Sequence, residues 1–326
     1  MSGGAGLSTS TLLGGAGADT FVINGATSSS ITSGAGADSL IFAGIVNTST
    51  ILSGTGADTL IFNAAVSRSS ITSSTDTSSY LFGTALTRST IIGGDGSDTL
   101  LFTYGELASI SGGAGVDSIL FTTGVSSSTI RGGTGSDSLA FAGITSSSIF
   151  GGTDGANLFT ASGIVSRSTL VGGSGADSFN FGGVVTQSLI TGGAGNEVIN
   201  FGGNTSATSI VGGAGADSVF FSAAATNAAA SNTYFFGANG GADTLAFGST
   251  NGGIVIAVSD SYGLSTSAFT FTSASSLVSF GAGGAGNTIQ LSGAFTGTAV
   301  SNINTLGSAT GISFITVSEA SITSLG

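Results

Sequence analysis

The residues of this chain with the greatest chemical potential are acidic residues that recur at a fixed spacing. Each ends a short Gly-rich segment, such as GGAGAD at residues 14–19. The series comprises Asp19, Asp38, Asp58, Asp98, Asp117, Asp137, Asp177 and Asp217. Carboxylates and glycine carbonyls together offer hard oxygen ligands for a cation, whereas Asp can also cap a turn by accepting a local backbone N–H. The pattern therefore predicts either a metal site or a structural corner, repeated along the chain.

Enzyme chemistry has little support from the composition. The chain contains no His and no Cys, so it lacks an imidazole base and a thiol nucleophile. The acids in the series are repetitive rather than a unique catalytic pair, and Glu106, Asp260 and Glu319 stand outside the series as isolated residues. We therefore expect that the protein is not an enzyme.

The charge balance also restricts the classes of partner. Sixteen acids oppose four cations, which gives a net charge of −12 at pH 7. The cations are Arg68, Arg88, Arg131 and Arg167. A nucleic acid needs basic side chains that neutralise its phosphates, so we expect no nucleic-acid partner. The absence of Cys further excludes disulfides and zinc–thiolate sites.

The acidic series reveals the repeat that organises the chain. Its members follow one another at intervals of 19 or 20 residues once Ser78, Asn157 and Glu197 fill the missing steps. A period in this range indicates stacked units that contact only their neighbours. The 40% hydrophobic content argues against disorder, even though the chain holds 58 Gly and no Pro.

Two strands in each repeat alternate apolar and small polar residues. Leu or Ile and then Phe stand two and four residues after most acids, as in Leu40 and Phe42, and these side chains should point inward. The second strand carries one inward aliphatic residue per repeat, such as Ile51, with a Ser two residues earlier. Stacking predicts a ladder of Phe rings and a ladder of inward Ser hydroxyls.

These elements predict an all-β fold, a parallel β-solenoid similar to a β-roll. It should contain about eleven coils over residues 1–221, counted from Asp19 to Asp217. Residues 222–326 should form an irregular last coil and a β-rich C-terminal cap that serves assembly or secretion. No run of about 20 apolar residues exists, so we expect no membrane span.

The Gly-rich segments identify a family resemblance. Residues 93–101 (GGDGSDTLL) and 132–140 (GGTGSDSLA) are similar to the GGxGxD nonapeptide of the repeats-in-toxin (RTX), or haemolysin-type calcium-binding, family. The resemblance implies Ca²⁺ held between neighbouring coils by Asp19, Asp38, Asp58, Asp98, Asp117, Asp137, Asp177 and Asp217. That family usually places two such loops in each coil. Here one loop per coil restricts the metal to one edge, and turn capping by the same aspartates is the competing interpretation.

An apolar row on the outside of the solenoid indicates a partner. The third residue after the acid should point outward, and in six adjacent repeats it is apolar: Val22, Ile41, Ile61, Leu81, Leu101 and Leu120. Such a patch is larger than a soluble monomer usually exposes. We expect another copy of the chain, or the C-terminal region, to cover it.

These features predict an extracellular structural protein, a calcium-stabilised β-solenoid that self-assembles into a filament, sheath or surface layer. An RTX-type adhesin or secretion module with a binding C-terminal region is the alternative, and an ice-binding solenoid is a further one. The RTX resemblance also implies export to the cell surface or medium by a type I-like route. No cleavable N-terminal signal is recognisable, and the C-terminal residues 315–326 are compatible with an uncleaved one.

Overall fold

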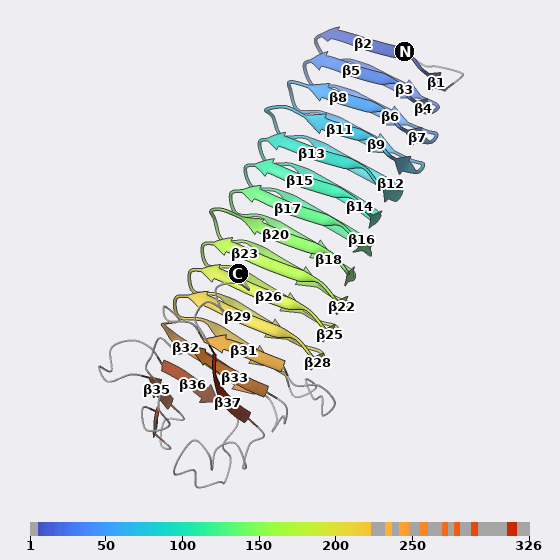
Figure 1. Cartoon of the computed structure of the whole chain (residues 1–326). Coiled ribbons are helices and arrows are strands. Elements are labelled where there is room, and N and C mark those ends of the chain that lie inside the picture. Colours follow the sequence, from blue (N-terminus) through green and yellow to red (C-terminus); the bar gives the residue numbers. More distant parts are fainter. Residues whose placement is uncertain are drawn as a thin grey trace. The chain divides into compact units, whose positions relative to one another are not determined.

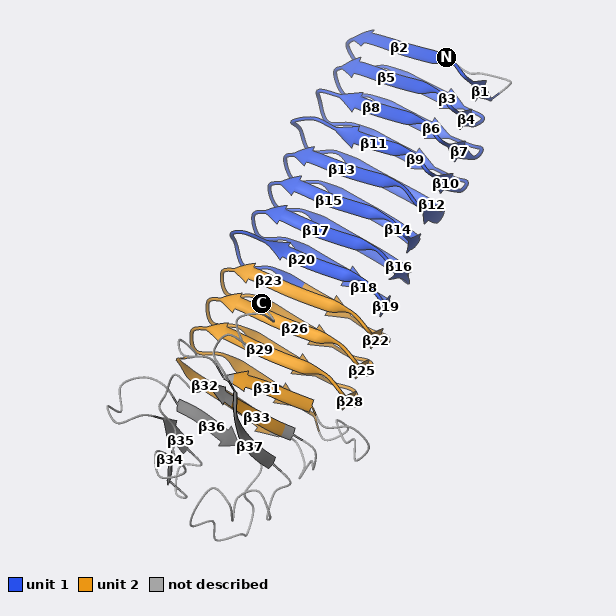
Figure 2. Ribbon diagram, viewed as in Figure 1, with its two compact units in different colours: residues 1–158 blue, residues 159–326 orange. Residues whose placement is uncertain are grey.

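The computed structural model describes residues 6–222, 232–236, 241–247, 254–259, 269–272, 277–280, 288–292 and 312–317. These residues form an all-β structure without helices, built from the stacked parallel coils of a β-solenoid of about eleven turns (Figure 1). The chain divides into two compact units, residues 1–158 and residues 159–326 (Figure 2). The predicted fold class is therefore confirmed.

Unit 1 consists of two parallel sheets, and each coil contributes one main strand to each sheet. Sheet A contains the strands that follow the acidic position: β3 (Thr20–Ile23), β6 (Ser39–Phe42), β9 (Thr59–Phe62), β12 (Ser79–Thr87), β14 (Thr99–Glu106), β16 (Ser118–Ser126) and β18 (Ser138–Phe141). Sheet B contains the strands that precede the next Gly-rich loop: β2 (Thr11–Ala16), β5 (Ser30–Ala35), β8 (Thr50–Gly54), β11 (Ser70–Ser73), β13 (Thr90–Asp95), β15 (Ser109–Ala114), β17 (Thr129–Thr134) and β20 (Ser148–Gly152). Sheet A is extended at the corner opposite the loop by β1 (Leu7–Ser8), β4 (Ala26–Thr27), β7 (Val46–Asn47), β10 (Val66–Ser67) and β19 (Ile144–Thr145).

Unit 2 repeats this architecture, and β21 (Leu158–Ala161) spans the boundary. Its sheet A strands are β24 (Ser178–Phe181), β27 (Val198–Phe201), β30 (Ser218–Phe221), β32 (Ala242–Phe247) and β36 (Thr288–Ser292), with corner strands β22 (Val165–Ser166), β25 (Val185–Thr186) and β28 (Thr205–Ser206). Its sheet B strands are β23 (Thr169–Ser174), β26 (Leu189–Ala194), β29 (Ser209–Ala214), β31 (Asn232–Phe236), β33 (Ile254–Ser259) and β37 (Ile312–Val317). An antiparallel segment, β34 (Phe269–Thr272) and β35 (Leu277–Phe280), joins sheet A through β36.

The predicted boundary at residue 221 lies between β30 and β31. Parallel pairing occurs on both sides of it, because β31 pairs with β29 and β33 pairs with β31. The later strands β36 and β37 also pair in parallel, with β32 and β33 respectively. Most of the sequence proposed as a secretion signal, residues 318–326, lies outside the described residues.

The alternation of apolar and polar residues places the core between the two sheets. Leu40 and Phe42 on β6 and Ile51 on β8 are fully buried, and their counterparts repeat from coil to coil. The predicted Phe ladder is present: in unit 1 the rings of Phe42, Phe62, Phe82, Phe102 and Phe121 stack with centroids 4.6–4.8 Å apart. In the part of the chain that the structure describes, no helix could cross a membrane.

The predicted Ser ladder also exists, at the corner opposite the Gly-rich loop. The backbone N–H of Ser29 donates to Ser49 Oγ at 3.2 Å, and the N–H of Ser49 donates to Ser69 Oγ at 3.1 Å. Each hydroxyl also donates to the carbonyl two residues earlier, as Ser49 Oγ does to Asn47 at 3.0 Å. The residue between them, here Thr48, has the left-handed φ of 53°. In these coils one serine thus closes the corner and joins two coils.

Candidate functional site

The acidic series lies inside the coils. Asp58, Asp98, Asp117, Asp137 and Asp217 are each 1% exposed, Asp38 and Asp177 are equally enclosed, and only Asp19 in the first coil is half-buried. Each residue stands where the Gly-rich loop meets sheet A, so parallel stacking places the carboxyls of a unit one above another. The structure therefore aligns the predicted residues within each unit. We call this alignment the acidic ladder, and it includes the residue at the position of the acidic series in every coil, whether or not that residue is an acid.

In most ladder aspartates one carboxyl oxygen accepts a hydrogen bond from the coil before it. The N–H of Asp38 donates to Asp58 Oδ1 at 2.9 Å, and the N–H of Asp98 donates to Asp117 Oδ1 at 2.8 Å. The N–H of Asp117 donates to Asp137 Oδ1 at 2.8 Å. A buried backbone N–H needs such a partner, so this oxygen has a structural role in each of these coils.

Two of the residues that replace Asp in the series, Ser78 and Asn157, keep the same position and accept the same bond. The N–H of Asp58 donates to Ser78 Oγ at 3.4 Å, and the N–H of Asp137 donates to Asn157 Oδ1 at 2.9 Å. In unit 2 Glu197 keeps only the donor half of the pattern: its N–H donates to Asp217 Oδ1 at 3.0 Å, whereas neither of its buried carboxyl oxygens has a hydrogen-bond partner. An acceptor oxygen, rather than a charge, is the property that Ser78 and Asn157 share with the bonded aspartates.

Unit 2 extends the ladder by a residue that we did not predict as a site residue. The N–H of Asp217 donates to Asp243 Oδ1 at 3.0 Å, and Tyr234 Oη donates to Asp243 Oδ2 at 2.6 Å. Asp243 belongs to a shortened motif, GGAD at residues 240–243, after an interval of 26 residues. The sequence signal was present, but the irregular interval removed Asp243 from the periodic series.

The second carboxyl oxygen faces the loop that precedes it. In Asp38, Asp98, Asp117 and Asp137 the buried Oδ2 has no hydrogen-bond partner. It lies close to the first glycine of the same loop. A Cβ added to Gly112 would lie 2.2 Å from Asp117 Oδ2, and a Cβ added to Gly132 would lie 2.2 Å from Asp137 Oδ2. Glycine at this place leaves room for the carboxyl group.

Burial opposes ionisation of these carboxyls. It raises the pKa of Asp117 to about 7, and the neighbouring carboxylates of Asp137 and Asp98 contribute to the rise, although the bond from the Asp98 N–H opposes it. Burial likewise raises the pKa of Asp98 and of Asp137 to about 6. In unit 2 burial and the adjacent carboxyl of Asp217 raise the pKa of Glu197. No arginine side chain contributes to the pKa values of these four carboxyls.

The ladder is a poor match to the ligand set of Ca²⁺, which takes six to eight oxygens. No three acidic side chains converge on one point within the described residues. Loop carbonyls are already bonded between coils: Gly36 N–H donates to the Thr55 carbonyl at 2.7 Å, and Gly115 N–H to that of Thr134 at 2.9 Å. Calcium binding by the eight aspartates stays a prediction. The bonds observed differ from local turn capping, because they join neighbouring coils; Asp19 in addition accepts a local N–H, from Gly15 at 3.1 Å.

The Gly-rich loops also carry exposed acids outside the series. Asp76 and Asp154 each cap a loop N–H of the preceding coil, from Gly56 at 2.8 Å and Gly135 at 3.2 Å. Asp95 lies between these two residues in the sequence and is exposed in its own Gly-rich loop. These three acids form no period in the sequence, because only three loops of unit 1 contain one, and they were therefore not predicted as site residues.

The outer face of sheet A in unit 1 carries the predicted apolar row. Leu81 and Leu120 are 38% and 39% exposed, and the other members are half-buried: Val22, Ile41, Ile61 and Leu101. Beside it, two residues earlier on each strand, runs a row of hydroxyl side chains that we did not predict: Thr20, Ser39, Thr59, Ser79, Thr99 and Ser118. We call these two rows the sheet A face. Neither row contains a charged residue.

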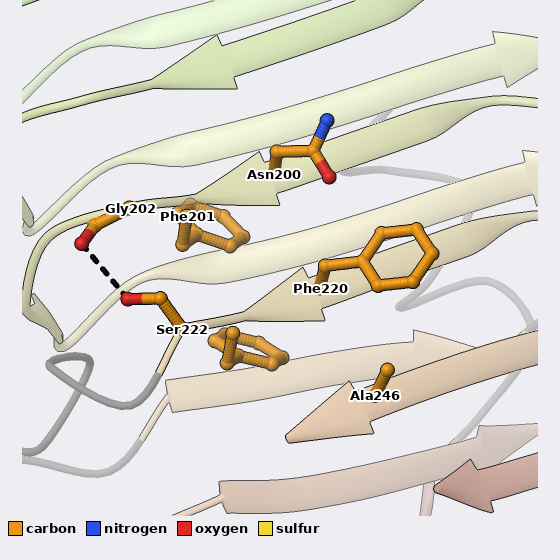
Figure 3. A pocket seen from close by; sticks show the side chains of 7 residues that line it. Asn200, Phe201, Gly202, Phe220, Ser222 and Ala246 are labelled. Carbon is orange, nitrogen blue, oxygen red and sulfur yellow. Dashed lines mark hydrogen bonds between the residues drawn. The ribbon is translucent and has the colours of Figure 1, made fainter. Parts of the chain in front are cut away.

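Unit 2 has a groove on the outer side of its sheet A (Figure 3). Its volume is about 420 Å³, and Asn200, Phe201, Gly202, Phe220, Phe221, Ser222 and Ala246 line it. The Phe220 ring is 42% exposed, and Asn200 Nδ2 donates to Asn180 Oδ1 at 2.7 Å. The groove combines an exposed aromatic ring with an amide, and no charged residue lines it.

The chain matches no protein-family model, and no curated protein matches its sequence.

Proposed function

We propose that this protein is an extracellular structural protein whose solenoid coils self-assemble into a filament, sheath or surface layer. The observation that supports the proposal is the sheet A face, which exposes an apolar row over six adjacent coils without a charged residue. Large apolar patches on soluble proteins mark interaction surfaces. The occupant that this face suits best is a second copy of the chain.

Regular spacing is the reason for choosing a second copy. Backbone hydrogen bonds between parallel strands set the distance between neighbouring coils at roughly 4.8 Å, so both copies have the same rise. The side chains of one row can therefore interdigitate with those of another copy along the full length of the row. A partner without this repeat would match the row at only a few points.

The resemblance to RTX repeats supports the extracellular part of the proposal. A chain without Cys is compatible with an oxidising environment, and the strong negative charge favours solubility before assembly. Export by a type I-like route is part of the same proposal. Detection of the full-length protein in the medium or on the cell surface of its source would test it.

The test of self-assembly compares two substitutions of equally exposed aliphatic residues. Leu81 on the sheet A face and Ile92 on the outer side of sheet B are both 38% exposed. We expect Leu81→Lys to shift the protein to monomers and Ile92→Lys to leave assembly intact, as measured by sedimentation velocity and electron microscopy. A wild-type chain that stays monomeric at high concentration would overturn the proposal, as would equal effects of the two variants.

An RTX-type adhesin or secretion module is the second candidate, and the groove beside Phe220 is the observation that favours it. An exposed ring can pack on the apolar side of a ligand while the Asn200 amide bonds to a polar group. The alternative predicts that the monomeric protein binds a surface saccharide and that Phe220→Ala abolishes this binding. Absence of binding to a broad glycan array would remove the alternative.

A further inference from the structure

We propose that the acidic ladder is an internal spine that keeps adjacent coils in register without a metal ion. This inference concerns the interior of the coils and does not rest on self-assembly. It explains why acids are buried in a chain whose loops resemble a calcium motif. Its first support is the occupation of one oxygen by a backbone N–H in coil after coil.

Each of these bonds specifies the register between two coils. The donor N–H and the acceptor carboxyl both belong to ladder residues, 19 or 20 positions apart. A slip of one residue would move the acceptor side chain to the other face of its strand and leave the donor N–H without a partner. The Phe ladder provides packing energy, whereas the acidic ladder discriminates between registers because its bonds are directional.

The space around the second oxygen is already occupied. A Cβ built on Gly112 would lie 2.2 Å from Asp117 Oδ2 and 2.6 Å from the Gly132 carbonyl oxygen of the next coil. The carboxyl group thus lies in a close-fitting space between two loop backbones. A cation there would require several further oxygens, whereas the loop carbonyls of Thr55 and Thr134 already accept N–H groups.

The chain contains its own neutral version of the spine. Asn157 is 1% exposed, like Asp117 and Asp137, and its Oδ1 accepts the Asp137 N–H at 2.9 Å. This bond is close in length to the 2.8 Å bonds that the carboxyls of Asp117 and Asp137 accept. A neutral amide therefore fills a ladder position with no change in the role of its oxygen, which is the behaviour expected of a structural acceptor.

The experiment replaces one ladder acid by its neutral isostere in the full-length protein. We expect Asp117→Asn to unfold at a Tm no lower than the wild type, in excess calcium chloride and in chelator alike. The Asp98 N–H should stay protected from hydrogen exchange. Asp117→Ala should lower the Tm in both conditions and expose that N–H. Glu106→Gln, at an exposed acid outside the Gly-rich loops, is the control and should change neither measurement.

Two results would overturn the inference. One is a wild-type Tm that rises with calcium while Asp117→Asn loses this rise, because the carboxylate would then be a ligand. The other is a loss of Tm in Asp117→Asn as large as in Asp117→Ala. If Asp117→Asn does not fold, the variant Asn157→Asp provides a second test. A structural spine gives this variant no calcium response, whereas a calcium site predicts a larger Tm rise with calcium than in the wild type.

Discussion

At the residue scale, a single serine side chain stabilises most of the corners opposite the Gly-rich loop. A non-glycine residue with left-handed φ costs about 1–2 kcal/mol. In unit 1 this conformation recurs at Ser28, Thr48, Arg68, Arg88, Leu107, Ser127 and Ser146. At each of these corners except that of Leu107, the hydroxyl of the next residue donates to the carbonyl that precedes the strained residue and accepts an N–H from the preceding coil, as Ser69 Oγ does. The corner is stable because the hydroxyl bonds offset the strain.

One coil lacks this hydroxyl, which gives a prediction at the residue scale. Ala108 stands in the serine position, so the Ser89 N–H has no hydroxyl acceptor there, although the N–H of Ala108 donates to Ser128 Oγ at 3.0 Å. We expect Ala108→Ser to stabilise the protein by about 1 kcal/mol, because it supplies a buried hydrogen bond. Chemical denaturation measures the effect. Ser128→Ala should produce the opposite change, and a destabilised Ala108→Ser would show that the corner has no room for the hydroxyl.

At the element scale, the Gly-rich loop requires glycine for a reason that depends on the stacking of coils. Gly113 has φ of 123°, and a Cβ on it would lie 1.8 Å from the Gly94 carbonyl oxygen of the preceding coil. Gly15 occupies the same motif position in the first described coil, where a Cβ would meet no atom within 4 Å. The requirement therefore comes from the neighbouring backbone as much as from the loop itself.

These two glycines share a motif position but differ in two respects, since Gly15 has neither the positive φ of Gly113 nor a backbone atom near its Cβ position. We expect Gly113→Ala to lower the free energy of unfolding by about 3 kcal/mol or more, through backbone strain and overlap with the preceding coil. Gly15→Ala should change it by less than about 0.5 kcal/mol, because its Cβ enters open space. Thermal and urea unfolding of both variants would check this. Similar losses in the two variants would mean that the loop needs glycine independently of stacking.

The strands and their faces could be predicted from the sequence because period-two alternation and the 19- or 20-residue repeat coincide in every coil. The inward orientation of Ile51 and Phe42 follows from this pattern alone. The orientation of Asp117 does not, since a loop acid can face solvent, a metal or the core. The stacked backbone N–H groups decide among these, and they are known only from the structure. The sheet A hydroxyl row, which includes Thr59, was overlooked because small polar side chains give a weak pattern.

At the scale of the whole molecule, the distribution of charge explains how the fold tolerates its acids. The net charge is −12, and the four arginines lie outside the ladder. A stack of buried carboxylates would repel one another strongly in the weakly polarisable interior. The pKa values of Asp98, Asp117 and Asp137 are raised in the folded state. Between about pH 4 and about pH 7 the folded protein therefore binds protons that the unfolded chain releases. The solenoid is thereby linked to pH.

The direction of this link is a prediction for the whole protein. In the unfolded chain these carboxyls titrate near pH 3.9, whereas their folded pKa values are about 6 to about 7. Their contribution to stability is complete below about pH 4 and is lost as the pH rises through about 7. We therefore expect the Tm, measured in chelator, to fall from about pH 4 to about pH 8. Bound calcium would reverse this trend, because protons compete with the metal for carboxylates.

The bonds of the acidic ladder also make each coil an interchangeable part. The coil of Asp117 supplies an acceptor for its predecessor and an N–H for its successor, so insertion or removal of a complete repeat of this kind recreates the same junction. Recombination between the repeats of such a gene would change the length of the protein in steps of one coil without creating a foreign interface. Length is thus a property that evolution could adjust in this fold while the sequence of each coil stays under the same constraints.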